Sequence, residues 1–464
     1  MEKVQHIERK SLLKILNAGE AMKWLFSKYN KKYLNVAIPA AMEGVFMSIL
    51  QAADLIMVGV LGSTAIAAVS IFIPLRLMLL TLARSMASAV TILVANKFGA
   101  KDFLGIKALL RQSFFICILA MGILHITFFC FFEKIVLLMG AKSDYAQLAV
   151  DYGTIAVVAV FISCLSLALQ AVQLGIGQTS AIMKCNIIGN LTNIVCNFFL
   201  ITGIGSFAGF GVKGAACGTV MGALTTLLLT MWIMGKNKYF AEGWLQLPDK
   251  SFWKEFKPIF TAIFSELGAE RIGMVIYARI TADLGTLAFA VHSICYSISD
   301  FAWDFIFGFG KANMVLAGQS CGRQNYEEWK IYRGLGLKWG VILATAFGAV
   351  IHIFWQEIFT LYNKDAAALA LSRSVMLIVA WHFYLTAQVI ITGGILRGSS
   401  KTAVVAAYSF VLITILRPLM TAGAVYYLHW GIVGVWLAIC LDQIFRSACF
   451  TYILYKIKSL PKIV

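Results

Sequence analysis

Long apolar runs recur along the chain from Tyr33 to Tyr455, and they constrain its fold more than any other feature. Runs of about 20 apolar residues have the length at which an α-helix crosses the hydrocarbon core of a membrane. Hydrophobic residues make up 60% of the 464 positions and charged residues only 13%, which leaves too little polar surface for a soluble protein of this size. We therefore predict an all-α integral membrane protein.

Twelve membrane-spanning helices are expected from the positions of these runs and of the polar turns between them. The predicted ranges are residues 34–58, 66–95, 108–131, 146–172, 185–205, 213–234, 258–281, 287–317, 331–354, 368–394, 403–427 and 433–455.

The distribution of basic residues predicts the orientation of these helices. Residues 1–33 carry eight Lys or Arg, and residues 235–257 carry five. The loops expected on the opposite side carry only four, which are Lys134, Lys142, Lys213 and Lys364. Since Lys and Arg concentrate in cytoplasmic segments, we predict a multi-pass protein of the cell membrane with both termini cytoplasmic. The net charge of +17 is then a topology signal, and no nucleic-acid partner is expected.

The sequence repeats itself with an offset of 223 residues. LGSTAIAAVSI at residues 61–71 matches LGTLAFAVHSI at residues 284–294 in six of eleven positions. The same offset aligns Gly99 with Gly322 and Gly175 with Gly398. This pattern indicates duplication of a six-helix unit. Because six is even, the two copies should share one orientation and form two lobes about a pseudo-twofold axis along the membrane normal.

The repeat also predicts the domain organisation. Residues 1–33 should form a basic cytoplasmic lead-in, and residues 34–234 the first lobe. Residues 235–257 should be a cytoplasmic linker, and residues 258–464 the second lobe.

Two carboxylates lie within the first predicted helix, at Glu43 and Asp54. A carboxylate in the middle of the bilayer costs about 2.5–3.5 kcal/mol, so such groups normally face a cavity or a partner. Eleven residues place both groups within about 20° of one helix face and about 16 Å apart along the axis. The 223-residue offset makes Glu43 the counterpart of Glu266. We expect both to flank a central cavity; the alternative is neutralisation by an arginine of the same lobe, such as Arg271.

Several segments resemble the multidrug and toxic compound extrusion (MATE) family. Pro39, Asp54 and the runs VGVLGSTAIAAVS and LVANKFGAKD resemble the first two helices of that family. LGTLAFAVHSI resembles its helix 7–8 segment, and GILRGSSKT its helix 10–11 signature. The resemblance implies a twelve-helix antiporter with two lobes that exports organic cations in exchange for protons or sodium ions.

The resemblance also assigns candidate coupling residues. It makes Asp54 the cation-coupling acid of the first helix, and it makes Asn193 and Asn197 the paired polar positions of the fifth. Glu266 matches the helix 7 glutamate of NorM-type members, and Glu270 lies one turn further on the same face. With Glu43, these residues form the predicted coupling and substrate site.

One departure from the NorM-type pattern concerns the tenth helix. NorM-type members carry an acid there, whereas this chain has no Asp or Glu between Asp365 and Asp442. Its absence favours protons over sodium as the coupling ion. We take Tyr277, His382 and Gln388 as candidates for lining the cavity.

Charged residues in the second and eighth helices predict a gate. Arg76 should meet Asp300 or Asp304 across the space between the lobes in one conformational state. The alternative is local neutralisation, with the side chains extending toward the membrane surface.

A flippase for lipid-linked precursors, from the same superfamily, is the alternative to an exporter. Such a substrate is anionic, so it is favoured by Arg76, Arg84, Arg271 and Arg417 and opposed by Glu43, Asp54, Glu266 and Glu270. The chain shows no P-loop, H-E-x-x-H or G-x-S-x-G motif, and its ten cysteines have no zinc-site spacing. We therefore expect a monomeric transporter of small molecules within the lipid bilayer, not an enzyme, without a cofactor other than its coupling ion.

Overall fold

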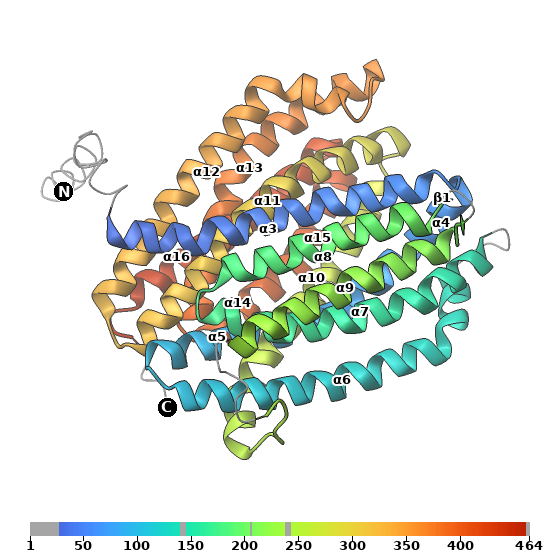
Figure 1. Ribbon diagram of the computed structural model, residues 1–464. Helices are drawn as coiled ribbons and strands as arrows, with labels where there is room; N and C mark the ends of the chain where they lie inside the picture. The colour runs from blue at the N-terminus through green and yellow to red at the C-terminus, as the bar shows by residue number, and fades with distance from the viewer. Residues whose placement is uncertain (1–26, 140–144, 205–206, 237–242, 461–464) are drawn as a thin grey trace, which may run out of the picture.

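A computed structural model describes residues 27–139, 145–204, 207–236 and 243–460 (Figure 1). Within this part of the chain the only strands are β1 (Gly203–Ile204) and β2 (Phe207–Ala208), which form a two-residue antiparallel hairpin. The all-α prediction is therefore confirmed.

Helices fill each half of the chain in the expected order. The first half contains α3 (Lys28–Gly59), α4 (Ser63–Ser70), α5 (Phe72–Gly99), α6 (Phe103–Leu138), α7 (Ala146–Gly175), α8 (Thr179–Leu200) and α9 (Val212–Lys236). The second half contains α10 (Lys250–Ala282), α11 (Thr286–Gly322), α12 (Tyr326–Thr360), α13 (Ala366–Gly398), α14 (Thr402–Ser409), the π-helix η1 (Phe410–Leu416), α15 (Arg417–Ala422), the π-helix η2 (Gly423–Tyr427) and α16 (Gly431–Lys456).

All twelve predicted helices are present, two of them in pieces. The second is divided into α4 and α5, and the eleventh runs from α14 to η2. Several helices extend beyond their predicted ranges, because amphipathic ends can continue a helix past the apolar run. Thus α10 begins within the predicted linker, where the Asp249 carboxylate accepts a hydrogen bond from the Phe252 backbone N–H at 2.7 Å. Residues 1–26 of the predicted lead-in and 237–242 of the linker lie outside the described residues.

Eight of the described helical segments are long and apolar enough to cross a membrane, by length and composition. The four long helices outside that set are α3, α8, α10 and α11. They carry the predicted site residues Glu43, Asn193, Glu266 and Asp300, whose polarity lowers their mean hydropathy. In Figure 1, α3 runs between α8 and α11, while α6 and α12 lie at opposite margins of the bundle.

The two described ends of the chain lie at the same end of the bundle. Lys32, near the start of α3, lies 3.8 Å from Glu328 in the first turn of α12. The Tyr326 hydroxyl at the start of α12 donates to the Ile457 carbonyl after α16, at 2.7 Å. We call this the basic end; α5, α7, α9, α11 and α13 also finish there.

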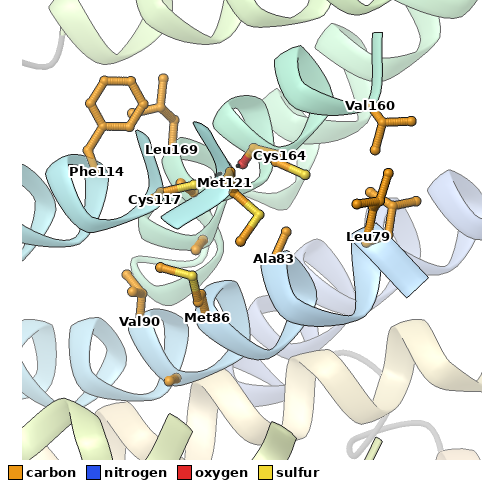
Figure 2. Close-up of a cluster of buried hydrophobic side chains, with 14 of the residues drawn as sticks. Leu79, Ala83, Met86, Val90, Phe114, Cys117, Met121, Val160, Cys164 and Leu169 are labelled. Carbon is orange, nitrogen blue, oxygen red and sulfur yellow. Dashed lines mark hydrogen bonds between the residues drawn. The ribbon is translucent and has the colours of Figure 1, made fainter. Parts of the chain in front are cut away.

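Apolar side chains of α5, α6 and α7 form most of a large buried cluster, to which α10 and α11 of the second half also contribute (Figure 2). One stripe of α5 faces the other two helices at the helical spacing i, i+4, i+7, i+11, and consists of Leu79, Ala83, Met86 and Val90. Cys117 and Cys164 lie in the same cluster, as Figure 2 shows, and the Cys117 thiol donates to the Cys164 carbonyl at 3.6 Å. All ten cysteines are free, and the five that are buried serve as small packing residues.

The two halves approach each other closely at the basic end, through a reciprocal pair of glycines. A Cβ on Gly99 would lie 2.1 Å from the Gln319 carbonyl oxygen, and a Cβ on Gly322 would lie 2.0 Å from the Asn96 carbonyl oxygen. Gly99 and Gly322 are related by the 223-residue offset, and so are Asn96 and Gln319. Gly99 and Gly322 are therefore needed for helix packing as well as for the turns that follow them. With a side chain at either position, α5 and α11 could not approach each other this closely.

Further contacts between the halves run from the basic end to the middle of the bundle. Asn313 Nδ2 donates to the Tyr33 hydroxyl at 2.7 Å, and nearer the middle Ser48 Oγ donates to Asp304 Oδ2 at 2.7 Å. Among the described residues, no hydrogen bond, ion pair or close glycine contact joins the halves beyond that point. The molecule is therefore closed at the basic end, and the polar residues nearer the other end face no tight junction between the halves.

Candidate functional site

Asparagines of α8 form a ladder along α3. Asn186, Asn190 and Asn197 each lie 143 positions after the α3 residue that they contact, which keeps the two helices in register. With Asn193, these residues are spaced i, i+4, i+7 and i+11, so they share one face of α8. Asn193 and Asn197 are buried, and Asn186 and Asn190 are half-buried. Each amide can both donate and accept hydrogen bonds, so the face offers polar partners inside an otherwise apolar bundle.

Asp54 meets this ladder near the end of α3 opposite the basic end. Asn197 Nδ2 donates to Asp54 Oδ1 at 3.0 Å and lies 3.4 Å from Asn193 Oδ1. Gly218 of α9 makes room for this group, since a Cβ there would lie 2.0 Å from Asn197 Oδ1. Asp54 has no ion-pair partner among the described residues, although Arg76 lies within electrostatic reach. The structure thus brings together the three residues that the sequence proposed for the first and fifth helices.

Glu43 lies nearer the basic end and has two partners. Asn186 Nδ2 donates to Glu43 Oε1 at 2.6 Å, and Lys311 Nζ of α11 lies 3.7 Å from Glu43 Oε2. Because α3 and α11 belong to different halves, this ion pair joins the two halves. Both side chains are half-buried, with 18% of Glu43 and 28% of Lys311 exposed.

Glu266, the repeat counterpart of Glu43, is neutralised within its own half. Arg397 Nη2, at the end of α13, donates to Glu266 Oε1 at 2.6 Å. The expected alternative partner was Arg271, which instead lies exposed on α10. The other oxygen, Glu266 Oε2, is buried without a hydrogen-bond partner in the described structure. The two equivalent glutamates therefore have different surroundings.

A mixed charged face lies where α5, α10 and α11 come together between the halves. Arg84 of α5 lies within electrostatic reach of Arg271 and of Asp304. Asp300 is exposed and within reach of both Arg271 and Glu270. Among the described residues, Arg76 forms no ion pair with either aspartate, so the predicted gate contact is not made in this conformation.

The candidates for lining the cavity are packed within the second half, where Tyr277 and His382 are buried and Gln388 is half-buried. Tyr277 is 3% exposed, and its ring stacks edge-on with His292 at 6.0 Å. His382 is buried and lies 2.7 Å from Gln443 Nε2, and Gln388 Nε2 donates to Thr451 Oγ1 at 3.0 Å. Their assignment to a cavity stays a prediction.

A buried ionic cluster in the second half was not anticipated from the sequence. Arg417 donates through Nε at 3.0 Å to Asp442 Oδ2, and Arg446 Nη2 donates to the same oxygen at 3.1 Å. The Arg417 guanidinium lies 5.7 Å from the centre of the Tyr277 ring. The i, i+4 spacing of Asp442 and Arg446 was a usable signal for half of this cluster. For the asparagine ladder of α8, the usable sequence signal was the helical spacing of Asn186 and Asn190 relative to Asn193.

Comparison with known proteins identifies the class. The MatE family model matches residues 39–199 and 258–423, one segment in each half and together more than half of the chain. The chain therefore belongs to the MatE family, and it is a multi-pass membrane transporter, not an enzyme.

Curated relatives of the chain are described as multidrug resistance proteins. It is 22% identical over 443 residues to the probable multidrug resistance protein NorM of Mannheimia succiniciproducens, covering 92% of this chain and 94% of that one. It is 24% identical over 384 residues to the multidrug resistance protein NorM of Vibrio cholerae, covering 80% and 82%.

Solved structures show the same fold. An outward-facing multidrug resistance MATE family transporter of the MOP superfamily matches with a TM-score of 0.83 at 20% identity, over 94% of this chain and 97% of that one. A MOP superfamily transporter from Pyrococcus furiosus matches equally, with a TM-score of 0.83 at 20% identity over the same shares. The predicted twelve-helix, two-lobe architecture is confirmed by these matches.

Proposed function

We propose that the protein is a secondary active exporter. It exchanges cationic or amphipathic small molecules for protons, or for sodium ions, by alternating access between its two halves. The relatives named as multidrug resistance proteins support the substrate class, and the repeat supports the mechanism.

This proposal rests on one observation, which is that Asp54 and the two glutamates have different kinds of partner. Glu43 and Glu266 are each paired with a basic side chain, whereas Asp54 is held by the neutral amide of Asn197. A carboxylate positioned by an amide keeps an oxygen for a proton or an organic cation. We therefore propose Asp54 as the coupling residue, with Asn193 and Asn197 orienting it. Glu43, Glu266 and Glu270 would shape the field around the substrate path.

The direction of opening fits export. With the basic end placed in the cytoplasm, the contacts between the halves close the cytoplasmic side. Asp54 would then be reached from the outside, where it would take up a proton and release the exported cation. In the opposite state, Arg76 and Asp300 would close the outer side; positions 76 and 299 are equivalent by the 223-residue offset, so these two groups lie at similar depth.

The test uses purified protein in liposomes with a fluorescent organic cation, under a proton gradient and a sodium gradient applied separately. We expect one gradient to drive transport at least tenfold above the no-gradient rate, and Asp54→Asn to lose that dependence. Glu133→Gln, which changes an exposed acid of α6, is the matched control. Wild-type gradient dependence in Asp54→Asn would remove Asp54 from the coupling role.

A charge exchange tests the proposed outer gate. Arg76→Asp and Asp300→Arg should each reduce transport, and the double variant should recover part of the loss because the pair is rebuilt with opposite polarity. Failure of the double variant to exceed either single variant would refute the pairing.

The alternative function is a flippase for lipid-linked precursors. Arg84 and Arg271 favour it, because they lie near each other on the charged face and would attract an anionic substrate. Absence of cation transport by the wild-type protein under either gradient, together with translocation of a fluorescent polyprenyl phosphate lipid, would favour the flippase.

A further inference from the structure

A cavity of about 340 Å³ opens at the basic end, where α3 of the first half meets α12 and the turn before it. Its lining consists of Lys28, Tyr29, Lys32, Arg323, Glu328 and Tyr332. We propose that this cavity binds a phosphate group and so holds the two halves together at the basic end. The group would belong to an anionic lipid or to free phosphate, and the proposal does not depend on the transported substrate.

The charges of the cavity are unbalanced in favour of an anion. Three cationic side chains face one carboxylate, and Arg323 already holds that carboxylate in a bidentate ion pair, at 2.8 and 2.9 Å from the Glu328 oxygens. Lys32 Nζ lies 3.8 Å from the same carboxylate, within electrostatic reach of both Arg323 and Lys28. Lys28 has no ion-pair partner among the described residues. Phosphate oxygens accept several charge-assisted hydrogen bonds, which suits this set of donors.

A buried hydroxyl gives independent support. Tyr332 is only 1% exposed, and its hydroxyl makes no hydrogen bond in the described structure, although Glu328 lies near it. The ring is fixed by Tyr29, edge-on at 5.9 Å, and by the Lys32 ammonium 5.7 Å from its centre. A buried polar group without a partner is unfavourable. The hydroxyl oxygen is itself closed to solvent, so a phosphate oxygen would reach it only after a small rotation of the ring or of the Glu328 side chain.

The start of α10 is the repeat counterpart of the start of α3, and the two differ in charge. The 223-residue offset relates Lys32 to Glu255 and Tyr29 to Phe252. Glu255 of α10 pairs with Lys97 of α5 at 3.1 Å, so that junction between the halves is neutralised by the protein itself. Phe252 is buried and stacks on Phe256 at 4.9 Å, whereas its counterpart Tyr29 is exposed at the cavity. At the α3 junction a base replaces the acid, and the cavity stays open to an anion.

The position of the cavity predicts its effect on conformation. Lys28, Tyr29 and Lys32 come from the first half, whereas Arg323, Glu328 and Tyr332 come from the second. Opening of the basic end would pull these two walls apart. A phosphate bound between them therefore favours the state that is closed at the basic end, by its differential affinity for the two states.

The experiment uses the full chain in nanodiscs of phosphatidylcholine. One arm adds inorganic phosphate, and the other replaces part of the lipid with phosphatidylglycerol at constant ionic strength. We expect one arm to raise the unfolding temperature of the wild type and to show the bound species by native mass spectrometry. Whichever arm succeeds identifies the source of the phosphate group.

The variants separate the cavity from general surface charge. Lys28→Gln with Lys32→Gln should raise the ligand concentration for half-maximal stabilisation about 25-fold, at about fivefold for each lysine. Tyr332→Phe, which keeps the volume, should weaken binding less, and Lys31→Gln on the same helix end is the matched control. If the double variant does not fold, Lys28→Gln alone gives the comparison. Equal stabilisation of variant and wild type, or none in either arm for the wild type, would overturn the proposal.

Discussion

Replacement of Gly322 by alanine should open the basic end of the molecule. The added Cβ would lie 2.0 Å from the Asn96 carbonyl oxygen and 2.8 Å from the Ala100 nitrogen. Ordinary van der Waals contact begins at 3.4 Å, so the helices must separate by more than 1 Å. The obstructing atoms are backbone, and no side-chain rotation can move them away.

The expected magnitude follows from the cost of overpacking. An extra methyl group in a tightly packed interface costs about 1–3 kcal/mol. That cost applies only to the state closed at the basic end, because the clash disappears when the halves separate. The closed population should therefore fall about 5- to 150-fold relative to the open one.

Distances between spin labels at Leu104 of α6 and Glu327 of α12 would measure this shift, in a background without the native cysteines. Both positions are exposed and lie at the basic end in different halves. Gly322→Ala should add a population at longer distance, whereas Gly334→Ala, which meets nothing within 4 Å, should match the wild type. Adding Gly99→Ala should change little more, since one separation relieves both clashes. An unchanged distance distribution in Gly322→Ala would refute the reasoning.

Two ion pairs give further predictions. Asp442→Asn should lower the free energy of unfolding by about 3–5 kcal/mol, because Arg417 then loses its buried partner. Thermal unfolding in detergent measures this loss, and an unchanged unfolding transition would contradict the prediction. Glu43→Lys with Lys311→Glu should restore the transport that either single change reduces, with a coupling of about 1 kcal/mol or less for this half-buried pair. Additive losses would show that the two groups act separately.

The candidate site was only partly predictable from the sequence. The resemblance to a known family placed Asp54 with Asn193 and Asn197, and the structure brings these residues together. The sequence could not identify the partners of Glu43 and Glu266, although the repeat showed that the two positions are equivalent. Helical periodicity gives the face on which a side chain lies, whereas the residue opposite it depends on how separate helices pack.

The sequence by itself determined the twelve helices and the two-lobe repeat, and it predicts their orientation in the membrane. These features depend on the length of apolar runs and on the placement of basic residues, which are local properties of the chain. Only the tertiary structure decided which end is closed, why Gly99 and Gly322 must lack side chains, and why Lys32 borders a cavity while Glu255 pairs with Lys97. Each of these features depends on contacts between atoms of the two halves. The distance between the halves depends in turn on the conformational state.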